Sequence, residues 1–147
     1  MPIRAATLAD VPAMRVLLAR SPRAAQWSEA QLSSLLGPGT PRLCLVLENQ
    51  GSLDGFLVAR SLGLEWELEN IVVAEATRRG GLGTRLLAAL FDHARSAAAT
   101  SIFLEVRESN LPARRLYEKF GFHPSGQRPR YYRDPAEDAV LYRLDLS

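Results

Sequence analysis

A basic, glycine-rich segment is the part of the sequence whose residue types point most directly to chemistry. Residues 78–84 read Arg-Arg-Gly-Gly-Leu-Gly-Thr and follow the apolar run 71–73. Three glycines let the backbone turn tightly and approach a ligand closely. In a helix that begins here, the first N–H groups have no acceptor within the helix, and the helix dipole adds positive charge. The segment is therefore predicted to bind an anion, and a pyrophosphate fits such a site.

Two well-known phosphate motifs do not match this segment, which narrows the choice of ligand. A P-loop requires Gly-Lys-Ser/Thr, but Gly83 is followed by Thr84 and Arg85. A dinucleotide fingerprint that begins at Gly81 would need glycine or alanine at the position where Leu86 stands. A flexible glycine turn with solvated arginines remains the alternative to an anion site.

Two titratable side chains further along the chain are candidates for moving protons. Glu105 lies in an expected strand, where alternation places it on one face with Phe103 and Arg107. It could act as a general base, or it could be a strand carboxylate paired with an arginine. Tyr117 lies in an expected helix and could donate a proton or be a core aromatic residue. Asn110 precedes that helix and could simply cap it.

The helices expected to position these residues have clear start and stop signals. Thr7 and Ser28 are good N-cap residues, and Ser28 opens a capping-box sequence. After Gly83, leucines recur at helical spacing and form one apolar stripe. Gly121 is the expected left-handed cap of the helix that carries Tyr117. Helices are therefore expected from residue 7 to about 20, over 28–36, after Gly83, and over 111–120.

The strands complete a mixed sheet. They are expected at 3–6, 42–48, 53–61, 64–73, 101–106, around Phe122, and at 138–146. The stretch 123–135, with its prolines and glycine, is expected to be largely a flexible loop. The order β-α-α-β-β-β-α-β-α-β-β predicts an α/β (α+β) protein with a mixed sheet and helices on both faces. Because 64–106 forms a β-α-β unit, its two strands should be parallel neighbours.

Length, composition and charge limit the classes of protein to consider. The 147 residues fit a single domain, 1–147, and a net charge of +2 does not indicate nucleic acid as a partner. Cys44 is the only cysteine, lies in an apolar run and is expected to be buried. With no signal peptide and no long apolar run, a cytoplasmic protein with no membrane partner is expected. His93 and His123 have no second ligand beside them, so no metal site is expected, and the sequence leaves the oligomeric state unknown.

The glycine-rich segment resembles a known signature. Arg78-x-x-Gly81-x-Gly83 after an apolar strand is similar to the acetyl-CoA motif of the GCN5-related N-acetyltransferases, the GNAT family, and the order of elements fits that fold along the whole chain. The resemblance implies a GNAT acyl-CoA N-acyltransferase fold in which the fourth and fifth strands, parallel neighbours, splay apart. It implies acetyl-CoA as cosubstrate, with cofactor contacts at Ile71, Val72, Val73, Arg78, Arg79, Gly80, Gly81, Leu82, Gly83 and Thr84.

A second resemblance concerns the proton-moving residues. The runs 104–110, Leu-Glu-Val-Arg-x-Ser-Asn, and 116–122, Leu-Tyr-Glu-x-Phe-Gly-Phe, resemble the RimI-type branch, the ribosomal-protein alanine N-acetyltransferases. This similarity implies Glu105 as the proton acceptor, Tyr117 as the proton donor to coenzyme A, and Asn110 as a cofactor contact. One departure is Gly80, which stands where that branch usually has a further basic residue.

The implied reaction is acetyl transfer by direct attack of an amine on the thioester. The resemblance names the α-amine of an N-terminal alanine, on a small-subunit ribosomal protein, as the acceptor. A small-molecule amine or a protein lysine side chain is the alternative acceptor, and a non-catalytic acyl-CoA-binding module is a third class. Glu65, Glu67 and Glu69 share a strand face that could attract a basic peptide or merely be solvated. Tyr131 and Tyr132 could wall a peptide groove or pack the last hairpin.

Overall fold

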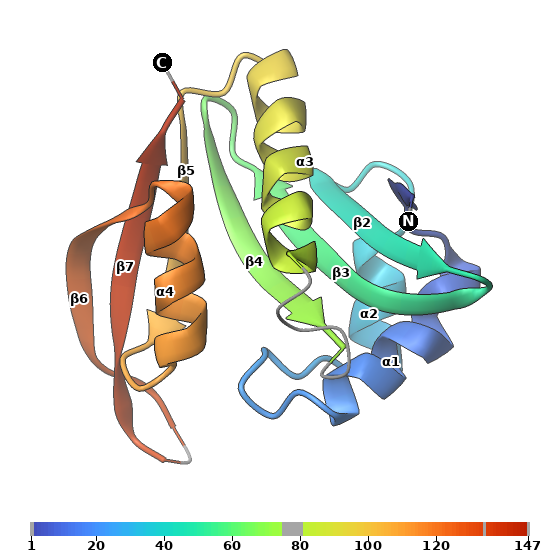
Figure 1. Ribbon diagram of the computed structural model, residues 1–147, viewed down its shortest axis with the longest axis horizontal. Helices are drawn as coiled ribbons and strands as arrows, with labels where there is room; N and C mark the ends of the chain where they lie inside the picture. The colour runs from blue at the N-terminus through green and yellow to red at the C-terminus, as the bar shows by residue number, and fades with distance from the viewer. Residues whose placement is uncertain (1, 75–80, 134, 147) are drawn as a thin grey trace.

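A seven-stranded sheet in the order β1-β2-β3-β4-β5-β7-β6 positions every other element (Figure 1). The computed structural model describes residues 2–74, 81–133 and 135–146. The strands are β1 (Ile3–Ala5), β2 (Arg42–Asn49), β3 (Ser52–Ser61), β4 (Glu65–Val73), β5 (Ser101–Arg107), β6 (His123–Tyr132) and β7 (Glu137–Asp145). The helices are η1 (Leu8–Asp10), a 3-10 turn, and α1 (Val11–Ala19), α2 (Glu29–Leu35), α3 (Leu82–Ser96) and α4 (Leu111–Phe120).

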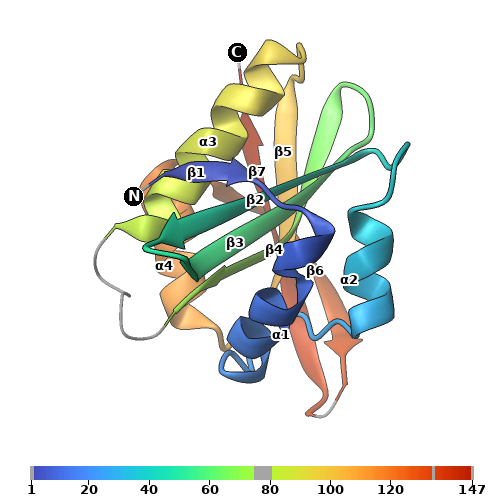
Figure 2. The ribbon, with the colours of Figure 1, turned by 90° about the vertical axis from the view of Figure 1, so that its right-hand side faces the viewer.

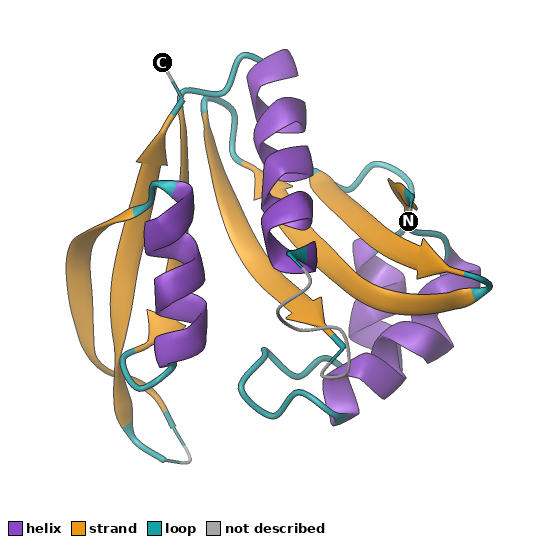
Figure 3. Ribbon diagram, viewed as in Figure 1, coloured by secondary structure: helices purple, strands orange, loops and turns teal. Residues whose placement is uncertain are grey.

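The helices cover both faces of the sheet, as the sequence predicts. Helices α1 and α2 lie on one face, and α3 and α4 lie on the other (Figures 2 and 3). Side chains alternate along the strands, so each face has its own apolar core. Leu57 and Leu47 pack with the residues of α3, whereas Phe56 and Val46 pack with those of α1. The predicted order of elements and the mixed α/β class are confirmed.

Two local expectations need correction. The first helix does not run unbroken from residue 7, because the Asp10 carboxylate accepts a hydrogen bond from the Thr7 backbone N–H at 2.8 Å and also pairs with Arg4. A 3-10 turn results, and α1 begins after it. The stretch 123–135 is not largely a loop, since residues 123–132 form β6, an exposed edge strand paired with β7.

The parallel strands β4 and β5 pair over a short length only. Their ladder joins Glu65 to Ser101 and ends where Glu67 meets Phe103, although β4 continues to Val73 and β5 continues to Arg107. Beyond that point β4 stays paired with β3, and β5 stays paired with β7. Figure 1 shows the two strands meeting near the top of the view and diverging below. The expected splay of the fourth and fifth strands is therefore present.

Two further expectations from composition can be compared with the structure. Cys44 is buried in the core, and burial raises the pKa of its thiol to about 12, so the thiol stays protonated near neutral pH. None of the helices in the described residues is long and apolar enough to cross a membrane.

Candidate active site

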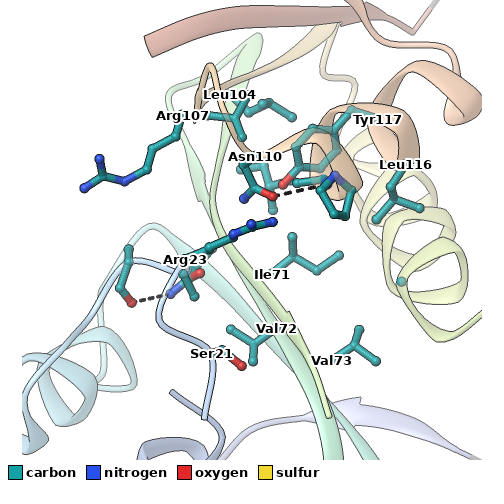
Figure 4. Close-up of a pocket in the computed structure, with 18 of the residues that line it drawn as sticks. Ser21, Arg23, Ile71, Val72, Val73, Leu104, Arg107, Asn110, Leu116 and Tyr117 are labelled. Atoms are coloured by element: carbon teal, nitrogen blue, oxygen red, sulfur yellow. Dashed lines mark hydrogen bonds between the residues drawn. The ribbon is translucent and has the colours of Figure 1, made fainter. Parts of the chain in front are cut away.

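The divergence of β4 and β5 creates a pocket of about 1000 Å³. Its walls are the second half of β4, the start of α3, the end of β5, one side of α4, and the segment 20–26 between α1 and α2. Figure 4 shows Ile71, Val72 and Val73 on one side and Asn110 and Tyr117 on the other. The predicted site residues that line the pocket are Ile71, Val72, Val73, Gly81, Leu82, Gly83, Thr84, Glu105, Asn110 and Tyr117. Arg78, Arg79 and Gly80 lie outside the described residues.

The start of α3 has the features of an anion site. Gly81 is the N-cap residue and adopts a left-handed conformation with φ of 77°, which favours glycine. No side chain of the described residues caps this helix end, so its first N–H groups face the pocket without an internal acceptor. A Cβ on Gly83 would lie 3.0 Å from a methyl group of Leu116, so glycine lets α3 approach α4 closely here.

Tyr117 combines a buried ring with a hydroxyl that faces the pocket. The side chain is only 6% exposed, and its ring centroid lies 5.8 Å from that of Phe122 and 6.2 Å from that of Tyr142. Burial raises the pKa of the Tyr117 hydroxyl, and nearby Tyr132 raises it further. The two sequence interpretations therefore do not exclude each other. The ring belongs to the core, and the protonated hydroxyl is available at the pocket.

Asn110 also has the structural role that the sequence allowed. Its side-chain oxygen accepts a hydrogen bond from the Ala113 backbone N–H at 3.4 Å, so it caps α4. The same residue lines the pocket beside Tyr117 (Figure 4).

Glu105 lies on the other face of the sheet from Tyr117. Its neighbours Leu104 and Val106 are buried in the core beneath α3 and α4, so alternation directs Glu105 toward the opposite face. The side chain is 12% exposed, and its Oε1 lies 3.4 Å from Nη2 of Arg128 on β6. Its Oε2 is buried and has no hydrogen-bond partner among the described residues. The carboxylate is paired with an arginine, but this arginine comes from β6 and not from its own strand.

The acidic face of β4 is neutralised by arginines. Glu65 pairs with Arg143 at 3.1 Å, Glu67 with Arg60 at 2.9 Å, and Glu69 with Arg42 at 2.8 Å. These carboxylates are therefore neither simply solvated nor free to attract a basic peptide strongly. The sequence shows the three glutamates but does not show their arginine partners. These partners lie on other strands: Arg42 on β2, Arg60 on β3 and Arg143 on β7.

The tyrosine pair near the end of β6 has divided roles. The two rings meet edge to face at 5.1 Å. Tyr132 lines the pocket beneath the Arg107 guanidinium, which lies 4.5 Å from its ring centroid, and burial together with the charge of Glu105 raises the pKa of Tyr132 to about 12. Tyr131 is exposed, and its ring lies against the Arg128 guanidinium, which is 5.1 Å from the ring centroid.

The wall formed by residues 20–26 was missed by sequence reasoning. Asn70 is buried in β4, and its side-chain nitrogen donates a hydrogen bond of 2.9 Å to the carbonyl of Ala25. From the same segment, the Arg23 side chain extends toward the space between Ile71 and Asn110 (Figure 4). A signal for Asn70 existed, because it is the one polar residue in the buried alternation of β4 with Trp66, Leu68 and Val72. Nothing local indicated where Arg23 would lie.

The described part of the chain holds no cluster of three or more His, Cys, Asp or Glu side chains suited to a metal ion. The pocket lining offers a carboxylate, a protonated phenol and helix N–H groups. These groups can bind an anion, accept a proton on one face of the sheet, and donate a proton on the other.

A mixed sheet opened between two parallel strands, with a glycine-capped helix start beside the opening, defines an N-acetyltransferase of the GNAT type. Residues 11–122 match the Acetyltransferase (GNAT) family, and the chain belongs to this family.

Similar proteins and solved structures are named as acetyltransferases as well. The [ribosomal protein bS18]-alanine N-acetyltransferase of Escherichia coli (strain K12) is 34% identical over 140 residues, which cover 94% of this chain and 93% of that protein. The crystal structure of the Escherichia coli ribosomal-protein-S18-alanine N-acetyltransferase superposes with a TM-score of 0.86 at 33% identity, covering 99% of this chain and 94% of that one. The structure of yncA from Salmonella typhimurium, a putative acetyltransferase determined with its cofactor acetyl-CoA, superposes with a TM-score of 0.79 at 26% identity. The match covers 100% of this chain and 94% of that chain.

Replacing Asn70 with alanine tests its role in holding the pocket wall. The variant leaves the Ala25 carbonyl without its donor and is expected to reduce the free energy of unfolding by about 1–3 kcal/mol. Amide hydrogen exchange should accelerate most in residues 21–26, because the lost bond ties that segment to β4. Asn49→Ala, which removes a half-buried side-chain bond to Asp54 near the end of the β2–β3 hairpin, is the control and should leave exchange in 21–26 unchanged. Equal acceleration across the whole sheet would contradict a local anchoring role.

Proposed function

We propose that this protein is an acetyl-CoA-dependent N-terminal acetyltransferase, which transfers acetyl to the α-amine of an N-terminal alanine on a small-subunit ribosomal protein. The observation that carries the proposal is the placement of Glu105 and Tyr117 on opposite faces of the opening between β4 and β5. The names of relatives that match nearly the whole chain support the choice of acceptor. The reaction would take place in the cytoplasm, where ribosomal proteins are made.

The residues present fit acetyl-CoA on structural grounds. The uncapped start of α3 offers N–H groups of Leu82, Gly83 and Thr84 to a pyrophosphate, and a Cβ at Gly83 would meet Leu116. Arg78, Arg79 and Gly80 would extend this contact. On the other wall, β4 makes no ladder pairs with β5 beyond Glu67 in the described residues, so its edge at Ile71 and Val72 can pair with an amide-bearing arm. Asn110 would contact the same ligand from the start of α4.

The chemistry follows from the two proton-moving groups. The acceptor's ammonium gives a proton to the Glu105 carboxylate, directly or through a water molecule, and the free amine attacks the thioester carbonyl. As the carbon–sulfur bond breaks, the Tyr117 hydroxyl gives its proton to the departing thiolate. The second N–H proton of the tetrahedral intermediate passes to water, and the Tyr117 phenolate regains a proton from water. A raised pKa suits Tyr117 to this role, because a neutral phenol is a better donor than one that is partly ionised at working pH.

Incubation with acetyl-CoA and short peptides tests the acceptor. A peptide that begins with alanine, in the sequence of a small-subunit ribosomal protein, is expected to gain about 42 Da, the mass of one acetyl group, on its α-amine. The same peptide with a blocked N-terminus and a free lysine is the control and should stay unmodified. Modification of the lysine alone, or of small amines alone, would contradict the N-terminal assignment and leave the acetyltransferase class standing.

Glu105→Gln tests the proton acceptor. The amide keeps the shape of the side chain but cannot accept the ammonium proton, so kcat near neutral pH is expected to fall about 100-fold or more. Acetyl-CoA affinity, measured by calorimetry, should change less than about twofold because Glu105 lies on the opposite face from α3 and α4. Glu108→Gln is the matched control, an exposed carboxylate bonded to Gln127, and should retain activity. A Glu105→Gln enzyme with unchanged turnover would remove Glu105 as the base.

Tyr117→Phe tests the proton donor, with Tyr142→Phe as its counterpart. Tyr117→Phe keeps the ring packing, so turnover should fall by about 100-fold with little change in thermal stability. Tyr142→Phe breaks bonds to Arg114 and Glu118 outside the pocket, so it should lower stability by about 1 kcal/mol and spare turnover. Because the donor must be protonated and its pKa is raised, the wild-type rate should show no loss from Tyr117 up to pH of about 10. Lost acetyl-CoA affinity in Tyr117→Phe would show a structural role instead.

A further inference from the structure

The proposed base already has a cationic partner. Arg128 reaches Glu105 from β6, outside the residues that line the pocket, and its Nη2 lies 3.4 Å from Oε1. The second oxygen, Oε2, is buried and receives no hydrogen bond from the described residues. A buried carboxylate oxygen without a donor is unfavourable. The site therefore has both a cation in place and an oxygen that lacks a donor.

The strand that supplies Arg128 is irregular at this point. Arg128 pairs with Ala139 and Tyr132 with Glu137, so the register shifts between them. Within this bulge Arg130 adopts a left-handed φ of 52°, which is unfavourable for a residue other than glycine. Arg128 is the last regularly paired residue before the bulge, and Tyr131 lies within it, where bulges re-aim side chains.

Arg128 and Tyr131 together form a cover, which we call the Arg128–Tyr131 cap. The Arg128 guanidinium lies 5.1 Å from the Tyr131 ring centroid. The negative charge of Glu105 is the main cause of the raised pKa of Tyr131, and burial raises this pKa further. The Arg128 side chain is 54% exposed, so it can leave Glu105 for solvent without breaking any packed contact in the core.

The pairing of Arg128 differs from that of the arginines around it. Arg107, on the same strand face as Glu105, is held by Glu137 and by the carbonyls of Arg133 and Pro135. Glu105 is the only carboxylate partner of Arg128 in the described part of the chain. The pair is long and half exposed, and such pairs contribute at most about 1 kcal/mol. Arg128 is thus a cation held weakly on the carboxylate that would accept the proton of an acceptor's ammonium.

We propose that Arg128 is a specificity-determining residue that occupies the place of the acceptor's ammonium on Glu105 and is displaced when the acceptor binds. The inference rests on the proposed function only in taking Glu105 as the proton acceptor. The exchange favours acceptors that carry a full positive charge, because a neutral group cannot replace a guanidinium on a carboxylate. After transfer the product is an uncharged amide. Once Glu105 has released its proton to water, Arg128 returns to the carboxylate and favours product release.

Steady-state kinetics of Arg128→Gln test this exchange. Without the competing cation, the KM for the acceptor is expected to fall about two- to fivefold, the range that corresponds to the loss of a weak surface ion pair. The dissociation constant for acetyl-CoA should be unchanged. Arg128→Lys keeps the cation and should restore a KM near that of the wild type. Arg130→Gln removes the same charge two residues away, where no side-chain contact to Glu105 is formed, and is the matched control.

Chemical rescue separates competition from a structural effect. Methylguanidinium added to Arg128→Gln is expected to raise the acceptor KM back toward the wild-type value while leaving kcat unchanged, and to affect the wild type less. A KM in Arg128→Gln that rises would show that Arg128 binds the acceptor. A KM equal to that of the Arg130→Gln control would show a surface pair without a role. Either result overturns the proposal.

A readout without turnover keeps this inference distinct from the proposed function. The guanidinium NMR signals of Arg128 should differ between wild type and Glu105→Gln, and titration with alaninamide should move the wild-type signals toward those of Glu105→Gln. Signals that stay in place up to molar alaninamide overturn the exchange. Failure of the wild type to acetylate any alanine peptide would instead overturn the choice of acceptor, whatever the Arg128 signals do.

Discussion

The early end of the ladder between β4 and β5 is the constraint on which the rest of the structure depends. Two parallel strands that stayed paired would fill the space between them with their own hydrogen bonds, and no pocket could form at that place. Because pairing stops at Glu67 and Phe103, each strand keeps its outer partner and the sheet opens without breaking. A close approach supports this geometry, since a Cβ on Gly55 of β3 would lie 2.8 Å from the carbonyl oxygen of Val72.

The opening also explains why the two proposed proton-moving groups are divided between two faces. Helix α4 places Tyr117 on the face that it shares with the start of α3, where an anion can bind. Strand alternation places Glu105 on the other face, near β6 and the segment anchored by Asn70. On the proposed function, a cosubstrate and an acceptor would enter from opposite sides and meet at the gap, without competing for one entrance.

Arginine provides almost all of the positive charge in this chain, and the structure uses it mainly to neutralise carboxylates. The pairs on β4 remove the field that three aligned glutamates would otherwise produce, so the acceptor side is less acidic than the sequence pattern indicates. On the proposed function, recognition of the acceptor would depend more on individual contacts near Glu105 and on the wall that Arg23 enters than on a broad acidic surface.

The sequence by itself determined the features that are local along the chain. The glycines at 81 and 83, the leucine stripe of α3, the Asn110 cap and the alternation around Glu105 set helix starts and strand faces, because those depend on near neighbours and on backbone sterics. Only the tertiary structure decided where β4 and β5 part, which arginine meets Glu105, and that residues 20–26 line the pocket, since each requires contact between segments far apart in sequence. Strand β6 belongs to this second group, because its prolines and polar residues resemble a loop until pairing with β7 defines it.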